Sequence, residues 1–259
     1  MSAAQLQTVD VAGRRLRTAR WGGGPVGIVM LHDGLGSLSQ WRDTPAEIAE
    51  ATGTAVMAFE RAGHGTSTPI PDGAWPADWL HIEARVFADL LRAMSIERPL
   101  VVGHSDGGSI ALLHAATGGD CRGLIVLAAH SWVETACTEA ITAMRQSADR
   151  FVAGLEPHHD DPRALFDAWS SVWVSREFSS WDIRPLLESI EVPTLVAQGD
   201  LDRYATDAQL TEMAAAIGPN ATIERLAGVG HIIHHEQPTA VMSLVADFYE
   251  QLPPEDRHA

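Results

Sequence analysis

A serine flanked by small residues lies at positions 103–107, where the chain reads Gly-His-Ser-Asp-Gly. This is a G-x-S-x-G sequence, in which a serine at a sharp turn between a strand and a helix becomes a nucleophile. The apolar run Pro99–Val102 before it predicts the strand, and Ser109–Ala116 after it predicts the helix. In that context Ser105 is the predicted nucleophile, and the chemistry is attack on a carbonyl carbon.

A serine hydroxyl needs a base, and the base needs a carboxylate that fixes its tautomer. His231 follows the last predicted strand in the sequence Gly-Val-Gly-His, and Asp202 follows the strand before it. Because both come after strands, as Ser105 does, we expect all three at the carboxyl edge of one parallel sheet. Asp200 and Glu134 also follow strands and remain alternatives for the acid.

The elements that must position these residues alternate between strand and helix. Gln5–Val11 and Arg15–Ala19 predict a hairpin, and the buried apolar runs that follow predict further strands. Those strands are 26–32, 54–60, 100–104, 124–128, 194–198 and 221–225, and the predicted helices are 41–51, 79–94, 109–116, 207–217 and 239–252. This rhythm predicts an α/β fold with a mostly parallel, doubly wound sheet.

The alternation of strands and helices is interrupted over residues 130–188, which show helical patterning and no convincing buried strand. This stretch holds four of the eight tryptophans, Trp132, Trp169, Trp173 and Trp181. We interpret it as a helical cap inserted into a core domain formed by residues 1–129 and 189–259. The first three of these tryptophans are candidates for contact with a substrate, because the core of a cap and the wall of a pocket are often the same surface.

The composition limits the partners and the mechanisms. The chain has 34 acidic and 18 basic side chains, all of the latter arginine, and a formal charge of −16 at pH 7. This balance argues against binding to nucleic acid, and the absence of lysine excludes Schiff-base and Walker-type phosphate chemistry. No segment has the pattern of a signal peptide or approaches the roughly 20 apolar residues of a membrane span. With only two cysteines, Cys121 and Cys137, we expect a cytoplasmic protein without disulfides.

Two pairs of adjacent histidines could suggest a metal site. One pair, at 158–159, precedes two aspartates, and the other, at 234–235, closely follows His231. Adjacent histidines on a regular element point to different faces, and neither pair has the His-x-x-x-His spacing of zinc ligands on a helix. We therefore predict no metal and no cofactor, with solvated or capping roles for these side chains.

Over nearly its whole length the chain resembles the α/β-hydrolase family. The motifs that carry the resemblance are Leu31–Ser37 (LHDGLGS), Glu60–Ser67 (ERAGHGTS), the GHSDG sequence, Gly199–Asp202 (GDLD) and Gly230–His231. The resemblance implies that Ser105, Asp202 and His231, which occur in the family's chain order, form a catalytic triad.

The resemblance also implies two backbone N–H donors for an oxyanion. One is the amide of Asp106, directly after the nucleophile. The other lies in the loop after the strand at 26–32, where family members commonly read His-Gly followed by the donor residue. Here the sequence is His32-Asp33-Gly34, with Asp33 in place of the usual glycine, and the donor is placed at Gly34.

The function expected from these residues is hydrolysis of a small carboxylic ester or lactone with an apolar or aromatic portion. The loop after the first buried strand resembles that of enol-lactonases and related carboxylic-ester hydrolases. Two alternatives stay open, which are hydrolysis of a carbon–carbon bond in a ring-cleavage product and a receptor or binding module on this fold. An intact triad argues against the binding module, because binding alone does not need all three residues.

Overall fold

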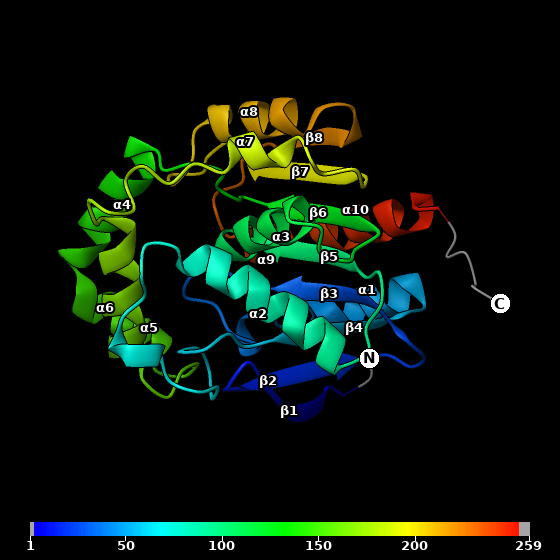
Figure 1. The fold of residues 1–259 in the computed structure, drawn as a ribbon, viewed down its shortest axis with the longest axis horizontal. Helices are drawn as coiled ribbons and strands as arrows, with labels where there is room; N and C mark the ends of the chain where they lie inside the picture. Colours follow the sequence, from blue (N-terminus) through cyan, green and yellow to red (C-terminus); the bar gives the residue numbers. More distant parts are fainter. Residues whose placement is uncertain (1–2, 254–259) are drawn as a thin grey trace.

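Within residues 3–253, which the computed structural model describes, eight strands form one sheet in the order β1-β2-β4-β3-β5-β6-β7-β8 (Figure 1). The strands are β1 (Gln5–Val11), β2 (Arg14–Trp21), β3 (Val26–Leu31), β4 (Ala55–Phe59), β5 (Leu100–His104), β6 (Gly123–Leu127), β7 (Thr194–Gly199) and β8 (Ala221–Leu226). β2 pairs antiparallel with both β1 and β4, and every pairing from β4 to β8 is parallel. The predicted α/β fold with a mostly parallel sheet is confirmed.

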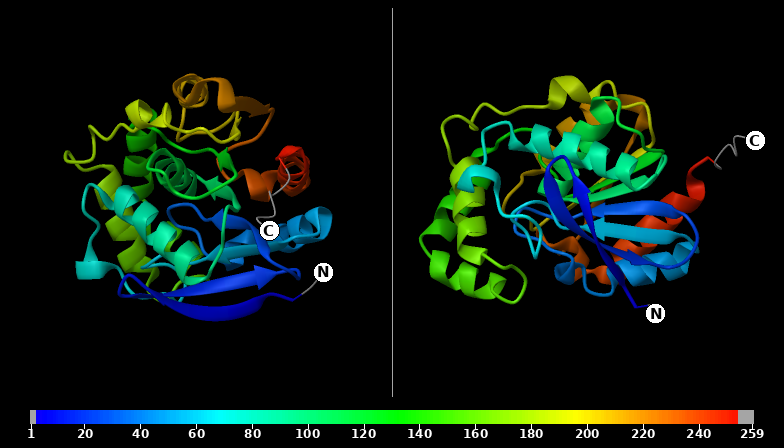
Figure 2. Two further views of the ribbon diagram at one scale, coloured as in Figure 1. Left: turned by 45° about the vertical axis from the view of Figure 1, so that its right-hand side comes forward. Right: turned by 60° about the horizontal axis from the view of Figure 1, so that its bottom comes forward.

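Helices cover both faces of this sheet (Figure 2). They are α1 (Thr44–Thr52), α2 (Trp79–Ala93), α3 (Asp106–Ala116), α4 (Thr135–Arg145), α5 (Ala148–Leu155), α6 (Pro162–Trp173), α7 (Arg184–Leu187), α8 (Asp207–Ile217), α9 (Ile233–Glu236) and α10 (Pro238–Gln251). Each predicted helix has a counterpart in this set with bounds that differ by a few residues.

Alternating side chains divide the core into two apolar layers, because successive residues of a strand face opposite sides of a sheet. In β3, Val29 and Leu31 pack on the side of α2, α3 and α8, whereas Ile28 and Met30 pack on the side of α1 and α10. All four side chains are at most 1% exposed. The central strands are therefore buried on both faces, which explains their continuous apolar sequences.

The register brings the carboxyl ends of the parallel strands to one edge. Leu31 of β3 lies opposite Gly103 of β5, and Gly199 of β7 lies opposite Leu226 of β8. The loops that follow β3, β5, β7 and β8 therefore emerge side by side. These loops carry the residues singled out from the sequence.

Helices α4, α5 and α6 lie beyond this edge, at the left of Figure 1. They pack on one another, and Val152, Leu155 and Phe166 form a small apolar cluster between α5 and α6. Helix α7, although it falls within the stretch 130–188, packs against α3 and α8 on a face of the sheet. We propose that the cap proper consists of α4–α6.

Among the described residues, no helix is both long enough and apolar enough to cross a lipid bilayer.

Candidate active site

Ser105 stands at the turn between β5 and α3 in a strained backbone conformation, with φ 51° and ψ −120°. Positive φ is unfavourable for a residue with a Cβ, and such strain persists only where the surroundings impose it. The flanking glycines allow the turn to form. A Cβ on Gly103 would lie 2.3 Å from the Gly107 carbonyl oxygen, and one on Gly107 would lie 2.2 Å from the Leu31 carbonyl oxygen. The G-x-S-x-G spacing thus follows from backbone packing around the serine.

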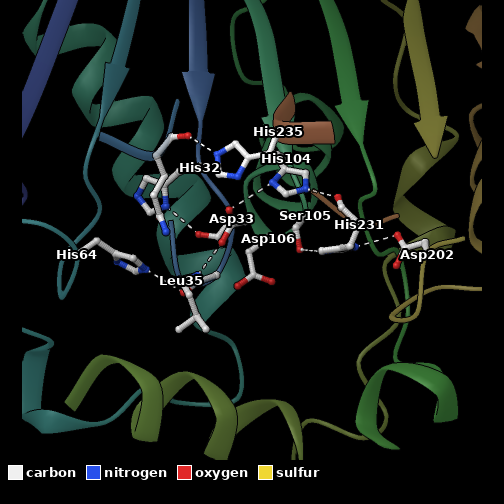
Figure 3. A network of polar contacts seen from close by, with 12 residues as sticks. His32, Asp33, Leu35, His64, His104, Ser105, Asp106, Asp202, His231 and His235 are labelled. Atoms are coloured by element: carbon white, nitrogen blue, oxygen red, sulfur yellow. Dashed lines mark hydrogen bonds and ion pairs between the residues drawn. The ribbon is translucent and has the colours of Figure 1, made fainter. Parts of the chain in front are cut away.

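The three residues of the predicted triad are hydrogen-bonded in series (Figure 3). The Ser105 hydroxyl lies 3.0 Å from Nε2 of His231, and Nδ1 of His231 lies 2.8 Å from Oδ2 of Asp202. Asp202 follows β7 and His231 follows β8, so the loops bring together side chains that are 126 and 29 residues apart. This arrangement can deprotonate a serine hydroxyl during attack.

The two alternative acids hold the surrounding loops instead. Asp200 accepts a hydrogen bond of 2.7 Å from the Gly228 amide. Glu134 accepts hydrogen bonds from the amide and the hydroxyl of Thr206. Neither carboxylate contacts His231, so the structure favours Asp202 as the orienting acid.

The charges around His231 favour its protonated form. Burial alone lowers the pKa of the imidazole, but the hydrogen bond and charge of Asp202, with the charges of Asp33 and Asp106, raise it above 6.5. Burial raises the pKa of Asp202, but its hydrogen bond to His231, the charge of that imidazole and the hydrogen bond from the Tyr204 amide together outweigh burial, and the pKa is lowered. Asp202 is thus a stable carboxylate that can compensate an imidazolium at His231.

The two predicted oxyanion donors flank Ser105 on the same cavity. Within the part of the chain that the structure describes, neither the amide of Gly34 nor the amide of Asp106 at the start of α3 donates a hydrogen bond. The next amide in the first loop, that of Leu35, is already bound to Oδ1 of Asp33 at 2.9 Å. The geometry therefore leaves the Gly34 and Asp106 amides available for an oxyanion, and the N-terminus of α3 favours negative charge there.

The side chain of Asp106 joins the cap to the turn that carries the serine. Its Oδ2 accepts a 2.9 Å hydrogen bond from Nε1 of Trp169 in α6. Burial raises the pKa of this carboxyl to about 6, although Arg61 and Trp169 act in the opposite direction. The contact passes directly over Gly34, where a Cβ would lie 2.0 Å from Trp169 Nε1. Glycine is therefore required at position 34 for this docking of the cap.

The cavity beside Ser105 has a volume of about 330 Å³. Helices α4, α5 and α6 contribute its apolar wall, with Ile141, Met144, Phe151, Trp169 and Trp173. Trp132 lies elsewhere, with the guanidinium of Arg184 stacked 4.3 Å from its ring. Of the three tryptophans proposed for substrate contact, the structure places two beside Ser105.

His130, Cys137 and Tyr204 are among the other side chains that line the cavity, and the sequence did not identify them as site residues. Burial and the neighbouring His231 lower the pKa of His130 to about 3, so this imidazole is neutral. Burial raises the pKa of the Cys137 thiol well above its usual range, so the thiol forms part of a neutral wall. His130 and Tyr204 follow strands at the carboxyl edge of the sheet, and this position in the sequence could have identified them. Cys137 lies within α4, where the sequence carries no comparable signal.

The paired histidines support loops. His159 accepts a hydrogen bond from the Gly65 amide and donates one of 3.0 Å to the carbonyl of Leu35, next to Gly34. His235 donates to the carbonyl of Gln40 at 2.6 Å. Among the described residues, no group of three or more histidine, cysteine, aspartate or glutamate side chains is placed to hold a metal ion.

Residues 28–244 match the model of a family described as the alpha/beta hydrolase family. The chain is 25% identical over 258 residues to Esterase Rv0045c from Mycobacterium tuberculosis, which covers 87% of this chain and 83% of that protein. It is also 36% identical over 110 residues to the dihydrolipoyllysine-residue acetyltransferase component of the acetoin cleaving system from Cupriavidus necator. That second match spans 42% of this chain and only 28% of the acetyltransferase component.

Solved structures show the same fold. The enol-lactonase from Burkholderia xenovorans LB400 superposes with a TM-score of 0.73 at 23% identity, which covers 95% of this chain and 100% of that one. At this identity the likeness concerns the arrangement of the elements. Together with the family match, it confirms the predicted fold and the resemblance on which the predicted site was based.

Proposed function

The chain belongs to the alpha/beta hydrolase family, and from that premise we propose that it is a serine hydrolase that cleaves a small, uncharged carboxylic ester or lactone. The observation that carries the proposal is the continuous hydrogen-bonded series from Ser105 through His231 to Asp202. The esterase name of one relative and the enol-lactonase title of one structural neighbour support the same reaction class.

In the proposed first step, Ser105 attacks the substrate carbonyl carbon while Nε2 of His231 accepts the hydroxyl proton. The carbonyl oxygen becomes an oxyanion, which the amides of Gly34 and Asp106 stabilise. The C–O bond to the leaving alcohol then breaks, and His231 donates its proton to that oxygen. The product of this step is an ester of the Ser105 hydroxyl with the acyl group.

In the second step, water replaces the alcohol as the nucleophile. His231 accepts a proton from the water, whose oxygen attacks the acyl carbon, and the proton returns to Ser105 as its bond to the acyl group breaks. Asp202 keeps the proton of Nδ1 in place throughout, so that Nε2 alone exchanges protons with the reactants. A lactone follows the same path, with the alcohol and acid released as one molecule.

The cavity supports an uncharged substrate with an apolar or aromatic part. Its wall contributed by the cap is apolar, and the acidic side chains that line it are Asp33 and Asp106. No arginine lines it within the described part of the chain, so a carboxylate or phosphate on the substrate would have no cationic partner. Burial of an apolar group against α4–α6 therefore contributes most of the binding energy.

The experiment that tests the proposal is covalent labelling by a fluorophosphonate, followed by a screen of p-nitrophenyl esters of graded chain length and of lactones. We expect stoichiometric labelling at Ser105 and turnover of short or aromatic esters. A folded protein that neither labels nor hydrolyses any of these substrates contradicts the proposal and favours the binding module. Turnover restricted to ring-cleavage products would favour the carbon–carbon hydrolase.

The plot of kcat/KM against pH should show one acid limb. Its midpoint should lie above pH 6.5, because it reports the raised pKa of His231. Asp202 stabilises the imidazolium and raises its pKa, and only the neutral imidazole can accept the serine proton. Activity is therefore fully present above that pKa and is lost as the pH falls through it. The measurement is kcat/KM for a p-nitrophenyl ester between about pH 5 and pH 9. A rate that stays constant across this range argues against a histidine base.

The carboxylate of Asp106 is a smaller source of this shift, after Asp202 and Asp33, because its charge also raises the pKa of His231. We expect Asp106→Asn to move the midpoint of the acid limb downwards while its backbone amide remains in place. Glu236→Gln is the matched control. It also neutralises a carboxylate, but one that accepts a hydrogen bond from the Gly230 amide in the loop that carries His231. An equal shift in both variants would mean that the limb reports loop geometry and not the charge of Asp106.

Removal of the aromatic wall should weaken substrate binding more than it slows chemistry. An aromatic contact contributes about 1 kcal/mol beyond its buried area, so we expect Trp173→Ala to raise KM about tenfold for an aromatic ester. Because the lost contact serves the ground state and the transition state alike, kcat should fall much less. The same measurement on Trp169→Ala tests the second tryptophan in this wall.

Trp181→Ala is the control for both, because Trp181 stacks on Phe178 with ring centroids 5.3 Å apart and does not line the cavity. It should lower the melting temperature and leave KM close to the value of the unmodified protein. If the wall variants keep both the KM and the ranking of ester substrates, the acyl or alcohol group binds elsewhere.

A further inference from the structure

Arg61 is a buried arginine that packs against the backbone of the loop that carries Gly34, and the mechanism described above does not use it. Its side chain is 1% exposed and does not line the cavity beside Ser105. Nη1 of Arg61 donates a hydrogen bond of 2.6 Å to the carbonyl of His32, and Nη2 donates one of 2.8 Å to the carbonyl of Asp33. The guanidinium therefore acts on the backbone of the oxyanion loop and not on the substrate.

The imidazole of His32 holds the same Asp33 carbonyl (Figure 3). Burial and the charge of Arg61 lower the pKa of His32 well below its usual range, so this side chain is neutral. The backbone amide of Arg61 donates to Nε2 of His32 at 3.2 Å, and the imidazole proton is therefore on Nδ1. Nδ1 donates it to the Asp33 carbonyl oxygen at 2.8 Å. That oxygen thus accepts two hydrogen bonds, which fix the orientation of its peptide group.

The Gly34 amide belongs to the same peptide group as the Asp33 carbonyl. All described peptide bonds are trans, and in a trans peptide the N–H and C=O bonds point in opposite directions. The two donors on the Asp33 carbonyl therefore turn the Gly34 N–H away from Arg61. Because Gly34 lines the cavity and Arg61 does not, this direction leaves the N–H available to an oxyanion.

The next two carbonyls of the loop also face buried histidines. Nε2 of His64 lies 3.0 Å from the carbonyl oxygen of Gly34, and Nε2 of His159 lies 3.0 Å from that of Leu35. Burial lowers the pKa of both imidazoles, so both are neutral at pH 7. Among these contacts to the loop, the one that brings a positive charge is that of Arg61.

This charge has no carboxylate in direct contact within the described part of the chain. The charges of Asp106, Glu83 and Asp33 act on the Arg61 guanidinium from a distance, and its Nε has no hydrogen-bond partner among the described residues. Burial of a charge with so few partners is costly. An oxyanion on the Gly34 amide would place a negative charge one peptide group away, and this attraction arises only when the substrate carbonyl is attacked.

We propose that Arg61 is a positioning residue for the oxyanion, which fixes the Asp33–Gly34 peptide with its N–H towards the cavity and places a positive charge behind it. Hydrogen bonds to the carbonyl of a peptide also strengthen its amide as a donor. The inference rests on the proposed function, because the oxyanion forms only if Ser105 attacks a carbonyl. Arg61 acts through the Gly34 amide and does not touch the substrate.

Arg61→Met tests this role, because methionine keeps an unbranched side chain and removes the charge and both hydrogen bonds. Loss of one oxyanion donor costs about 100-fold or more in kcat, so we expect kcat for p-nitrophenyl butyrate to fall about 100-fold. KM should change less than about threefold, because the interaction develops only in the transition state. Arg61→Lys restores a cation without the planar fork, and its kcat should recover to about a tenth of the unmodified value.

Phenyl trifluoromethyl ketone probes the oxyanion itself. The Ser105 oxygen bonds to the ketone carbon, the hydroxyl proton passes to His231, and the carbonyl oxygen becomes an oxyanion with no leaving group to expel. In Arg61→Met the inhibition constant of this ketone should rise about 100-fold, in proportion to the fall in kcat/KM. An unchanged inhibition constant, or a KM that rises as much as kcat falls, overturns the inference.

Arg122→Met is the matched control. It also neutralises an arginine, one that is half-buried over the ring of Tyr249 at 4.1 Å and directly precedes the amino end of β6. It should lower the melting temperature and leave kcat and the inhibition constant within about twofold. If Arg61→Met does not fold, Arg61→Lys carries the test through a kcat reduced about tenfold at unchanged KM, and a loss confined to KM overturns the inference.

The orientation of the peptide can be observed without any activity. In a crystal structure of Arg61→Met, the carbonyls of His32 and Asp33 lack their charged donor, and we expect the Asp33–Gly34 peptide to have turned its N–H out of the cavity. An unchanged peptide overturns the inference, whatever the enzyme hydrolyses. A turned peptide, together with an unmodified protein that does not label with fluorophosphonate, would support positioning by Arg61 and contradict the proposed function instead.

Discussion

Ser105→Ala should lower kcat/KM by about 10⁴-fold or more and leave the protein fully folded. Loss of the nucleophile removes the covalent path, and the remaining residues accelerate the reaction only through the oxyanion donors and binding. The fold should be unaffected, because alanine has the same Cβ at φ 51° and the lost hydroxyl bonds only to His231. The measurements are ester hydrolysis and the thermal unfolding midpoint of each protein.

Ser109→Ala is the matched control for this variant. Ser109 lies one turn further along α3, is fully buried, and donates a 2.7 Å hydrogen bond to the carbonyl of His130. Its loss leaves that carbonyl without its partner and should destabilise the protein by about 1–3 kcal/mol, with much less effect on turnover than Ser105→Ala. If Ser105→Ala retained more than about a tenth of the activity, the nucleophile would have to be another residue.

The fold was predictable because its central strands are buried on both faces. A run such as Val26–His32 is continuously apolar and bounded by glycine and proline, and the structure places β3 there. The parallel topology then places the ends of β5, β7 and β8 at one edge, so that positions directly after these strands predicted the proximity of Ser105, Asp202 and His231. Periodicity and connectivity gave the strands and the shared edge, whereas the choice of these three residues as the triad followed from the resemblance to the α/β-hydrolase family.

The contacts of individual side chains were not predictable in the same way. Trp132 and Trp173 belong to the same tryptophan-rich stretch, but one stacks under Arg184 and the other lines the cavity. Which of them faces the serine depends on how the cap helices pack, and no local pattern encodes that packing. The hydrogen bond from Arg61 to the Asp33 carbonyl likewise joins residues 28 positions apart and depends on the register of β3 against β4.

Asp202→Asn should reduce kcat by about 10⁴-fold, far more than Asp200→Asn, although the two residues are separated by one position. The structure shows why the first change is so damaging. Oδ1 of Asp202 accepts the Tyr204 amide at 2.8 Å, so an asparagine would keep its oxygen there and turn its amide group towards Nδ1 of His231. That group donates, so Nδ1 would have to accept and the imidazole proton would move to Nε2. The nitrogen that faces Ser105 could then no longer take up the serine proton.

Asp200→Asn has no such consequence, because the Asp200 carboxylate only accepts the Gly228 amide through Oδ1, and an asparagine oxygen can do the same. We expect its kcat to stay within about threefold of the unmodified value. The two variants change the same chemical group in the same loop, so a general disturbance of the loop would affect both alike. Steady-state kinetics with one p-nitrophenyl ester distinguishes the cases. A larger loss in Asp200→Asn would show that the orienting carboxylate in solution is Asp200, and that the contact of Asp202 with His231 does not fix the tautomer.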